Sequence, residues 1–389
     1  MVPVWLLTVT VTVATLLLTT LTQAQPEANF KCATEATCRS LTDYASANAT
    51  TLKEIETLFG VKHFLDLLGA NNLPTDTKNT YKLNASQVIK VPFPCKCGNG
   101  IGKSNNLPRY KIKPGDTLSE IATVRFAGLV KYQQIQTANN IPDANNTTIQ
   151  TANNIPDANN ITAGDTLWIP LPCSCDKVDD SSVLHYAHVV EAGNTIDIIA
   201  QKYGTTPQTL LSINGIDDPK TLQAGQVLDV PLPVCKSNVG NNSVDFPLLV
   251  PNRTYFYTAN DCVKCKCDST GSNNNSNSML QCEESNIKPI NHWSVCPSAK
   301  CSGNVLIGNT TSTDSCNRTF CDYAGYTSRN ISTVLATQNT CAVAPSGSSG
   351  SGSGSGGSDS GASRSILNGW VWNKLLILIH FLLFFVYLL

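Results

Sequence analysis

The stretch Tyr110-Lys-Ile-Lys-Pro-Gly-Asp-Thr-Leu-Ser-Glu-Ile-Ala122 decides the fold, because it recurs as His188-Val-Val-Glu-Ala-Gly-Asn-Thr-Ile-Asp-Ile-Ile-Ala200. Each copy begins with a short alternating strand, turns at a glycine, and continues with apolar residues at helical spacing. Thr117 and Glu120 have the spacing of a capping box, which predicts that a helix begins there. Both copies therefore predict a strand, a turn and a helix.

A second helix and a closing strand follow in each copy. Pro207 after Thr206 is typical of a helix start, and the second helices end in Ala138-Asn-Asn-Ile141 and Ile213-Asn-Gly-Ile216. The closing strands are predicted at 164–172 and 225–233, each with a Pro-x-Pro end. The order strand, helix, helix, strand (βααβ) predicts an α+β fold with modules at 109–172 (module 2) and 186–233 (module 3).

A more diverged copy precedes these two, at 32–97 (module 1). Thr51-Leu-Lys-Glu54 repeats the capping box, Leu68-Gly-Ala-Asn-Asn-Leu73 repeats the helix end, and Val88-Ile-Lys-Val-Pro-Phe-Pro-Cys95 repeats the closing strand. Its first strand is predicted near Ser40 to Tyr44. The chain therefore contains three tandem βααβ modules.

Module 2 departs from the pattern by an internal duplication of fourteen residues. Residues 135–146 recur without change as 149–160. Ile141 is the natural end of the second helix, whereas Ile155 has the normal spacing to the closing strand. Because both cannot occupy one groove, the excess is expected to bulge into solvent, and added loop length costs little entropy. The sequence leaves open which copy lines the groove.

The cysteines indicate an oxidising compartment. All sixteen lie between Cys32 and Cys341, and the apolar start of the chain, residues 1–24, is typical of a signal peptide. Ten of them, from Cys235 onward, predict a small disulfide-stapled domain at 245–341. Cys262-Val-Lys-Cys-Lys-Cys267 admits a zinc knuckle, but disulfides are favoured in a secreted chain, and no metal is expected.

The end of the chain resembles a lipid-anchor signal. Residues 346–365 form a Gly/Ser-rich linker and 366–389 end in an apolar tail, which predicts glycosylphosphatidylinositol (GPI) attachment at Ser360 or Gly361. A C-terminal transmembrane helix is the alternative, although the apolar stretch is short for it. Either anchor places the protein on the extracellular face of the plasma membrane.

Charge and glycosylation signals fit an extracellular protein. The formal net charge of −1 gives no electrostatic reason to expect nucleic acid as a partner. Sequons predict N-linked glycans at many asparagines, among them these: Asn48, Asn84, Asn145, Asn160, Asn241, Asn252, Asn274, Asn309, Asn317 and Asn330.

No residue set in the sequence predicts catalysis. His185 and His188 are interpreted as ordinary surface residues that share one face of an edge strand, and no Cys or Ser nucleophile motif accompanies them. Glu283 and Glu284 are adjacent, so they diverge instead of flanking a glycosidic bond. The chain is therefore predicted to be no enzyme and to need no cofactor.

The repeated motifs resemble a known family. The turn Gly115-Asp-Thr-Leu118, the helix end Ala138-Asn-Asn-Ile-Pro142 and the strand Trp168-Ile-Pro-Leu-Pro172 are similar to LysM domains. Three such modules, the Cys-x-Cys pairs and the GPI-type tail resemble the plant LysM GPI-anchored receptor-like proteins. Within that family, 69–74, 185–190 and 258–267 are most similar to the chitin elicitor-binding branch.

The resemblance implies a fold and a function. It implies disulfides Cys32–Cys97, Cys38–Cys175 and Cys95–Cys173, which would clamp the modules together. It also implies plant innate immunity as the role, a LysM receptor-like kinase as signalling partner, and a homodimer formed on ligand binding. The binding site for chitin oligosaccharides would lie on module 2, with these residues: Lys113, Pro114, Gly115, Asp116, Thr117, Leu118, Asn140, Ile141, Pro142, Asp143, and, from the second copy, Ile155, Pro156, Asp157.

The chemistry of these two loops suits an N-acetylated sugar. Backbone amides and carbonyls of the loops can bond the acetamide group, and Leu118 and Ile141 offer apolar surface to its methyl group. Module 3 carries Glu191-Ala-Gly-Asn-Thr195 and Asn214-Gly-Ile-Asp217 at the same places, and is expected to bind weakly or only to pack. Bacterial peptidoglycan is the alternative ligand, and a structural wall glycoprotein is the alternative function.

Overall fold

The computed structural model describes residues 30–141, 161–268, 278–290, 293–314 and 316–339. The predicted signal peptide, the Gly/Ser linker, the GPI attachment residues Ser360 and Gly361, and the apolar tail lie outside the described residues, so they stay predictions. None of the helices in the described part of the chain is long and apolar enough to cross a membrane.

Module 1 has the predicted βααβ order. Its first long strand spans the whole segment predicted near Ser40 to Tyr44, and its capping box forms, because the Thr51 hydroxyl accepts from the Glu54 amide and the Glu54 carboxylate accepts from the Thr51 amide. Its elements are β1 (Phe30–Lys31), β2 (Ala36–Ala45), β3 (Thr50–Thr51), α2 (Leu52–Phe59), α3 (Phe64–Ala70), β4 (Lys82–Leu83), β5 (Val88–Gly98) and β6 (Ile101–Ser104).

Module 2 repeats the order with shorter strands. Thr117 caps the first helix through a hydrogen bond from the Glu120 amide, but this helix passes after one turn into a π-helical turn. Its elements are β7 (Arg109–Lys111), α4 (Leu118–Glu120), η1 (Ile121–Arg125), α5 (Tyr132–Ala138) and β8 (Thr166–Trp168).

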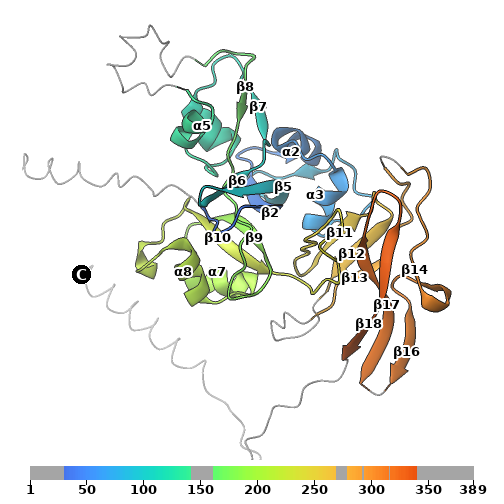
Figure 1. Ribbon diagram of the computed structural model, residues 1–389. Helices are drawn as coiled ribbons and strands as arrows, with labels where there is room; N and C mark the ends of the chain where they lie inside the picture. The colour runs from blue at the N-terminus through green and yellow to red at the C-terminus, as the bar shows by residue number, and fades with distance from the viewer. Residues whose placement is uncertain (1–29, 142–160, 269–277, 291–292, 315, 340–389) are drawn as a thin grey trace, which may run out of the picture. The chain divides into compact units, whose positions relative to one another are not determined.

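Module 3 is the most regular copy. Thr206 and Pro207 begin its second helix as predicted. Its elements are β9 (Val183–Val189), α7 (Ile196–Tyr203), α8 (Pro207–Asn214), η2 (Pro219–Thr221) and β10 (Val227–Pro233). Figure 1 shows both of its helices on the same side of β9 and β10.

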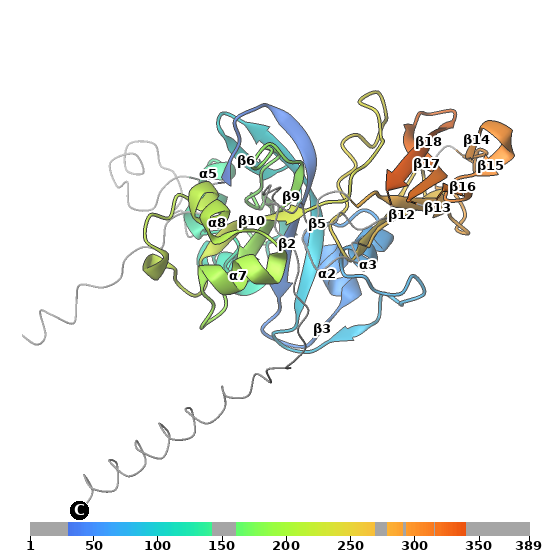
Figure 2. The ribbon, with the colours of Figure 1, turned by 90° about the horizontal axis from the view of Figure 1, so that it is seen from below.

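Modules 1 and 3 are joined by one six-stranded sheet, in the order β1-β6-β5-β2-β9-β10 (Figure 2). β2 pairs in parallel with β9, where Leu41 and Thr42 face Tyr186 and Ala187. Buried polar side chains of β2 complete this junction, since the hydroxyls of Ser40 and Thr42 donate to carbonyls of β9. The first strands of two repeats thus form the junction between modules.

Disulfides and a shared core join module 2 to module 1. The structure contains Cys32–Cys97, Cys38–Cys175 and Cys95–Cys173, the three pairs that the resemblance implied. The rings of Phe59 and Phe126 meet edge to face across the two modules, 5.6 Å apart. Module 3 is held differently, because these three bonds stop at Cys175 and its connection to module 1 runs through the sheet.

The cysteine-rich domain consists mainly of β-strands in its described residues, with one short 3-10 helix. Its core includes Cys235, Val239 and Val250, so it begins before the predicted boundary at residue 245. Its sheets are β11-β12-β13, β14-β15 and β16-β17-β18, with these bounds: β11 (Thr254–Thr258), β12 (Val263–Cys267), β13 (Gln281–Glu284), β14 (Lys300–Cys301), η3 (Ser302–Asn304), β15 (Val305–Leu306), β16 (Thr310–Asp314), β17 (Asn317–Tyr326) and β18 (Ile331–Asn339).

The cysteines of this domain form disulfides and leave no zinc knuckle. Cys262, Cys265 and Cys267 pair with Cys296, Cys282 and Cys235, and Cys301 pairs with Cys321. The one group of sulfurs in the described residues close enough to suggest a metal, at Cys38, Cys95 and Cys175, consists of disulfide sulfurs.

The interpretation of His185 and His188 as surface residues of an edge strand is wrong. β9 lies inside the sheet, and the two side chains are 3% and 1% exposed. Three residues apart on a strand, they point to opposite faces, not to one. Each pairs with a buried carboxylate: His185 Nδ1 lies 2.8 Å from Asp229, and His188 Nδ1 lies 2.8 Å from Asp43.

Candidate oligosaccharide-binding site

The first loop of the predicted site, residues 113–118, is a tight turn followed by a helix start. The Asp116 amide donates to the Lys113 carbonyl at 3.1 Å, and Gly115 has φ 86°, as the third position of a type II turn requires. Pro114 suits the second position. Module 3 repeats this turn, with Asn194 donating to Glu191 across Gly193.

The Asp116 side chain holds the first loop in shape. Its carboxylate is buried, and it accepts hydrogen bonds from the Tyr110 hydroxyl at 2.7 Å and from the Lys113 amide at 2.8 Å. Burial opposes ionisation of Asp116, but these bonds and Arg125 outweigh it and lower its pKa. Burial and the same carboxylate raise the pKa of Tyr110 to about 12. The contact fixes the turn against β7.

The second loop begins with an asparagine that clips the helix end to the closing strand. The Asn139 side-chain amide donates to the carbonyls of Ile135 and Trp168, and its oxygen accepts from the Trp168 amide. Asn71 and Asn214 make the same three bonds in modules 1 and 3. The repeated helix-end motif is therefore first of all a structural clip.

The next two residues present the loop to solvent. Asn140 adopts the left-handed conformation, φ 54°, and is exposed, while Ile141 is half-buried and packs on the same core as Leu118. The Ile141 amide bonds back to the Gln136 carbonyl at 3.0 Å, which closes the helix end. The first copy of the duplicated segment therefore ends the helix; Pro142, Asp143, Ile155, Pro156 and Asp157 lie outside the described residues.

Leu118 does not offer the apolar surface predicted for it. Its side chain is 6% exposed because it is the first core residue of the helix that Thr117 caps. Its backbone and the exposed Lys113, Pro114, Gly115 and Thr117 remain in the loop. A Cβ added at Gly115 would meet no atom within 4 Å, so space lies open beside the turn.

In module 1 the cysteine-rich domain contacts the equivalent loop, although Asn72 and Pro74 stay exposed. The Tyr255 hydroxyl donates to the carbonyl of Leu73, the counterpart of Ile141, at 2.6 Å. Tyr255 and Tyr257 both belong to the core that modules 1 and 2 share. Nearby, the Arg39 guanidinium lies 3.5 Å from the centre of the Phe256 ring. No sequence pattern except the aromatic strand itself indicated this contact.

The predicted glycosylation sites that the structure describes all lie on the surface. Asn48, Asn84, Asn241, Asn252, Asn309, Asn317 and Asn330 are exposed, and the other three lie outside the described residues.

Comparisons with known proteins agree with this architecture. The LysM domain model matches residues 110–145, 143–170 and 188–231. The LysM domain-containing GPI-anchored protein 2 of Arabidopsis thaliana is 44% identical over 80% of this chain and 83% of its own length. The chain belongs to the family of LysM domain-containing GPI-anchored proteins. The first two matches divide LysM module 2 between the two copies of its duplication.

Two further similarities extend the comparison. The chitin elicitor-binding protein of Oryza sativa subsp. japonica is 42% identical over 82% of this chain and 85% of its own length. A solved ectodomain of a receptor like kinase is 22% identical, with a TM-score of 0.41, over 51% of this chain and 94% of its own. The name of the Oryza sativa relative describes that protein as a binding protein.

Proposed function

We propose that this protein is a cell-surface receptor component that binds chitin oligosaccharides through module 2. One observation carries the choice of module. At the helix-end loop of module 1 the Tyr255 hydroxyl already bonds the Leu73 carbonyl, although Asn72 stays exposed, whereas in module 2 Lys113 to Gly115 and Asn140 are exposed on both loops. The Oryza sativa relative named as a chitin elicitor-binding protein supports the choice of ligand.

The chemistry of the two loops favours an N-acetylated sugar. The turn at Gly115 leaves room for a pyranose ring to approach the backbone, and the exposed loops offer peptide groups to the acetamide N–H and C=O. Ile141 keeps part of its side chain accessible for the acetyl methyl. A sugar that lacks the acetamide would leave these partners unused, so glucose oligomers should bind far less tightly.

Signalling requires a partner in this proposal. We infer a GPI-anchored protein on the extracellular face of the plasma membrane, which takes part in plant innate immunity together with a LysM receptor-like kinase. A chitin chain long enough to reach two copies would bridge them into a homodimer. Long oligomers would then bind better than short ones through effective concentration, without any new contact.

The test is a calorimetric titration of the secreted protein with GlcNAc oligomers of increasing length, with cellulose oligomers of equal length as the control. The expected result is binding that strengthens with GlcNAc chain length and is absent for cellulose. Equal affinity for both sugars would overturn the acetamide argument. Competition with peptidoglycan fragments tests the alternative ligand, since displacement of chitin by lower concentrations of those fragments would favour it.

A further inference from the structure

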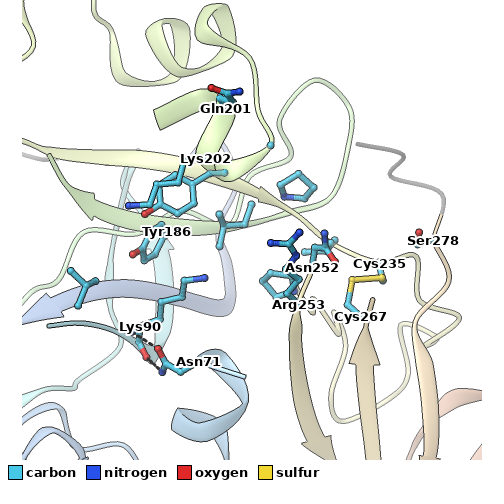
Figure 3. Close-up of a pocket in the computed structure, with 17 residues that line it drawn as sticks. Asn71, Lys90, Tyr186, Gln201, Lys202, Cys235, Asn252, Arg253, Cys267 and Ser278 are labelled. Atoms are coloured by element: carbon cyan, nitrogen blue, oxygen red, sulfur yellow. Dashed lines mark hydrogen bonds between the residues drawn. A yellow bond between two sulfur atoms is a disulfide. The ribbon is translucent and has the colours of Figure 1, made fainter. Parts of the chain in front are cut away.

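A cavity lies where module 1, module 3 and the cysteine-rich domain meet, and it is separate from the proposed chitin site. It has a volume of about 600 Å³, within the range of ligand-binding cavities. β5, α7 and β10 contribute to its wall, together with the segment before β11 and the Cys235–Cys267 disulfide (Figure 3). None of its lining residues belongs to module 2.

The charged residues that line this cavity are all basic. Lys90 comes from β5, Lys202 from α7 and Arg253 from the turn before β11, and no Asp or Glu of the described residues lines the wall. The whole chain has 27 basic and 28 acidic residues. A wall with three cations and no carboxylate therefore differs from the chain's balanced composition, and it attracts anions.

The cations of the cavity are poorly neutralised by the protein. Lys90 is half-buried, and burial and the positive charge of Lys202 lower its pKa. Lys202 has a carboxylate partner, Glu191, but the two groups lie 3.9 Å apart and are 47% and 53% exposed. Such an exposed pair contributes little. An anion between Lys90 and Lys202 would relieve their repulsion.

The remaining residues of the wall suit a sugar. Asn71, Gln201 and Ser278 provide amide and hydroxyl groups, and the half-buried ring of Tyr203 forms part of the wall, while Tyr186 behind it is 1% exposed. The Asn71 side chain is already bonded to the backbone of Lys90, which fixes the base of that lysine. The ring of Tyr203 can pack on a pyranose ring, the amides can bond its hydroxyls, and the cations can pair with an acidic substituent.

We propose that this cavity binds an acidic saccharide, with its carboxylate held between Lys90, Lys202 and Arg253. The size and polar lining of the cavity favour a carboxylated sugar over a bare inorganic anion, which would leave most of the cavity unfilled. The site is independent of the proposed chitin site, so one protein would read two kinds of glycan: a neutral N-acetylated chain on module 2 and an acidic one here.

The experiment uses the full secreted chain and two matched probes. A galacturonic acid oligomer carries the carboxylates, and its fully methyl-esterified form has the same rings without charge. We expect the acidic oligomer to bind, with affinity that falls as salt rises, and the ester to bind at least tenfold more weakly. Each titration is run with and without enzymatic removal of N-linked glycans, because Asn252 of a sequon lies on the cavity wall.

Variants assign the binding to the cavity. The double variant Lys90→Gln/Arg253→Gln should bind the acidic oligomer at least tenfold more weakly. Lys177 is an exposed cation outside the cavity, so Lys177→Gln should leave this affinity unchanged. The GlcNAc-oligomer titration monitors folding and should not change in any variant. If the native protein binds the acidic oligomer but not GlcNAc oligomers, the proposed chitin site on module 2 is wrong and the cavity site is supported.

Three results would overturn the proposal. They are equal binding of acid and ester, unchanged binding of the acidic oligomer in the double variant, and absence of binding in both glycosylated and deglycosylated protein. Inorganic phosphate that binds as tightly as the acidic oligomer would replace the saccharide site with a simple anion site.

Discussion

The Tyr255 hydroxyl donates a 2.6 Å hydrogen bond to the carbonyl oxygen of Leu73, which joins the cysteine-rich domain to the helix-end loop of module 1. The backbones of α3 and β11 also approach closely, because a Cβ added at Gly69 would lie 2.1 Å from the Tyr255 carbonyl oxygen. Burial raises the pKa of Tyr255 well above its usual value, so the hydroxyl keeps its proton for this bond. The domain thus engages one peptide group of the module 1 loop, while the neighbouring Asn72 stays exposed.

Replacement of Gly69 tests this contact. We expect Gly69→Ala to destabilise the protein by about 3 kcal/mol or more, because its methyl group would overlap backbone atoms that cannot move aside easily. Gly98→Ala in β5 is the matched control, since no atom lies within 4 Å of its added Cβ, and its effect should stay within about 0.5 kcal/mol. Urea unfolding followed by tryptophan fluorescence measures both, and equal stabilities would contradict the close approach.

Local elements could be predicted from the sequence because local chemistry determines them. The capping box at Thr51, the turn glycine Gly115 and the proline at Pro207 each satisfy backbone needs within a few residues. Two other contacts join residues more than a hundred positions apart. They are the parallel pairing of β2 with β9 and the hydrogen bond from Tyr255 to Leu73. No periodicity encodes such contacts, so neither was predicted.

The prediction that His185 and His188 are exposed was wrong for the same reason, because their burial depends on contacts with distant residues. A histidine in a short alternating strand is read as exposed when the strand is taken for an edge, but β9 has neighbours on both sides and covered faces. Their partners, Asp229 and Asp43, come from other strands of the sheet. At the proposed site, the turn and helix end were predicted, while burial of Leu118 and Asp116 was not, because burial depends on packing between elements.

Substitutions at the helix ends test which module and which copy bind chitin. We expect Ile141→Ala to weaken GlcNAc-oligomer binding about tenfold, or about 1.4 kcal/mol, through loss of the methyl contact. Ile216→Ala removes the equivalent half-buried residue of module 3 and should leave affinity unchanged. Ile155→Ala should also have no effect, since Asn139 to Ile141 end the helix.

Calorimetry on the three single variants and the Ile141/Ile155 double variant gives the answer. Unchanged binding in the double variant would place the chitin site outside these two helix ends, and absence of GlcNAc-oligomer binding in the native chain would support a wall glycoprotein whose modules only pack. A loss seen with Ile155→Ala alone would assign the groove to the second copy of the duplication.

Deletion of residues 142–155 tests the duplication directly. The deletion joins Ile141 to Pro156 and restores the spacing that module 3 shows between Ile216 and the closing strand. We expect the shortened chain to keep both its stability and its GlcNAc-oligomer binding, because loop length contributes little to stability. Thermal unfolding and calorimetry measure the two properties, and loss of binding in a stable protein would show that the extra residues take part in the site.

His63 makes the stability of the protein depend on pH. Hydrogen bonds to Asp261, 2.9 Å away on the cysteine-rich domain, and to Asp66 raise the pKa of His63 to about 10 from an ordinary 6.5. Because the folded protein binds this proton more tightly, its contribution is fully present below pH 6.5 and is lost as pH rises toward 10. We expect a contribution of about 1.5–3 kcal/mol to the free energy of unfolding, typical of a hydrogen bond to a charged group. Urea unfolding between pH 6 and 10 should show this decline in the native chain and a flatter profile in His63→Gln, and parallel profiles would exclude the role of His63.

The buried pair of Asp43 and His188 should be the most sensitive point of the junction between modules 1 and 3. The Asp43 carboxylate is 2.8 Å from His188 Nδ1 and also accepts from the Val189 amide, so one side chain of β2 satisfies two donors of β9. Asp43→Ala would leave both donors buried without that acceptor, and we expect a loss of about 3–5 kcal/mol. Asp43→Asn keeps an acceptor and should recover part of the loss, while Glu35→Ala, an exposed acid, should change stability by less than about 0.5 kcal/mol. Equal urea midpoints for Asp43→Ala and Glu35→Ala would mean that the parallel strand pairing alone holds the two modules together.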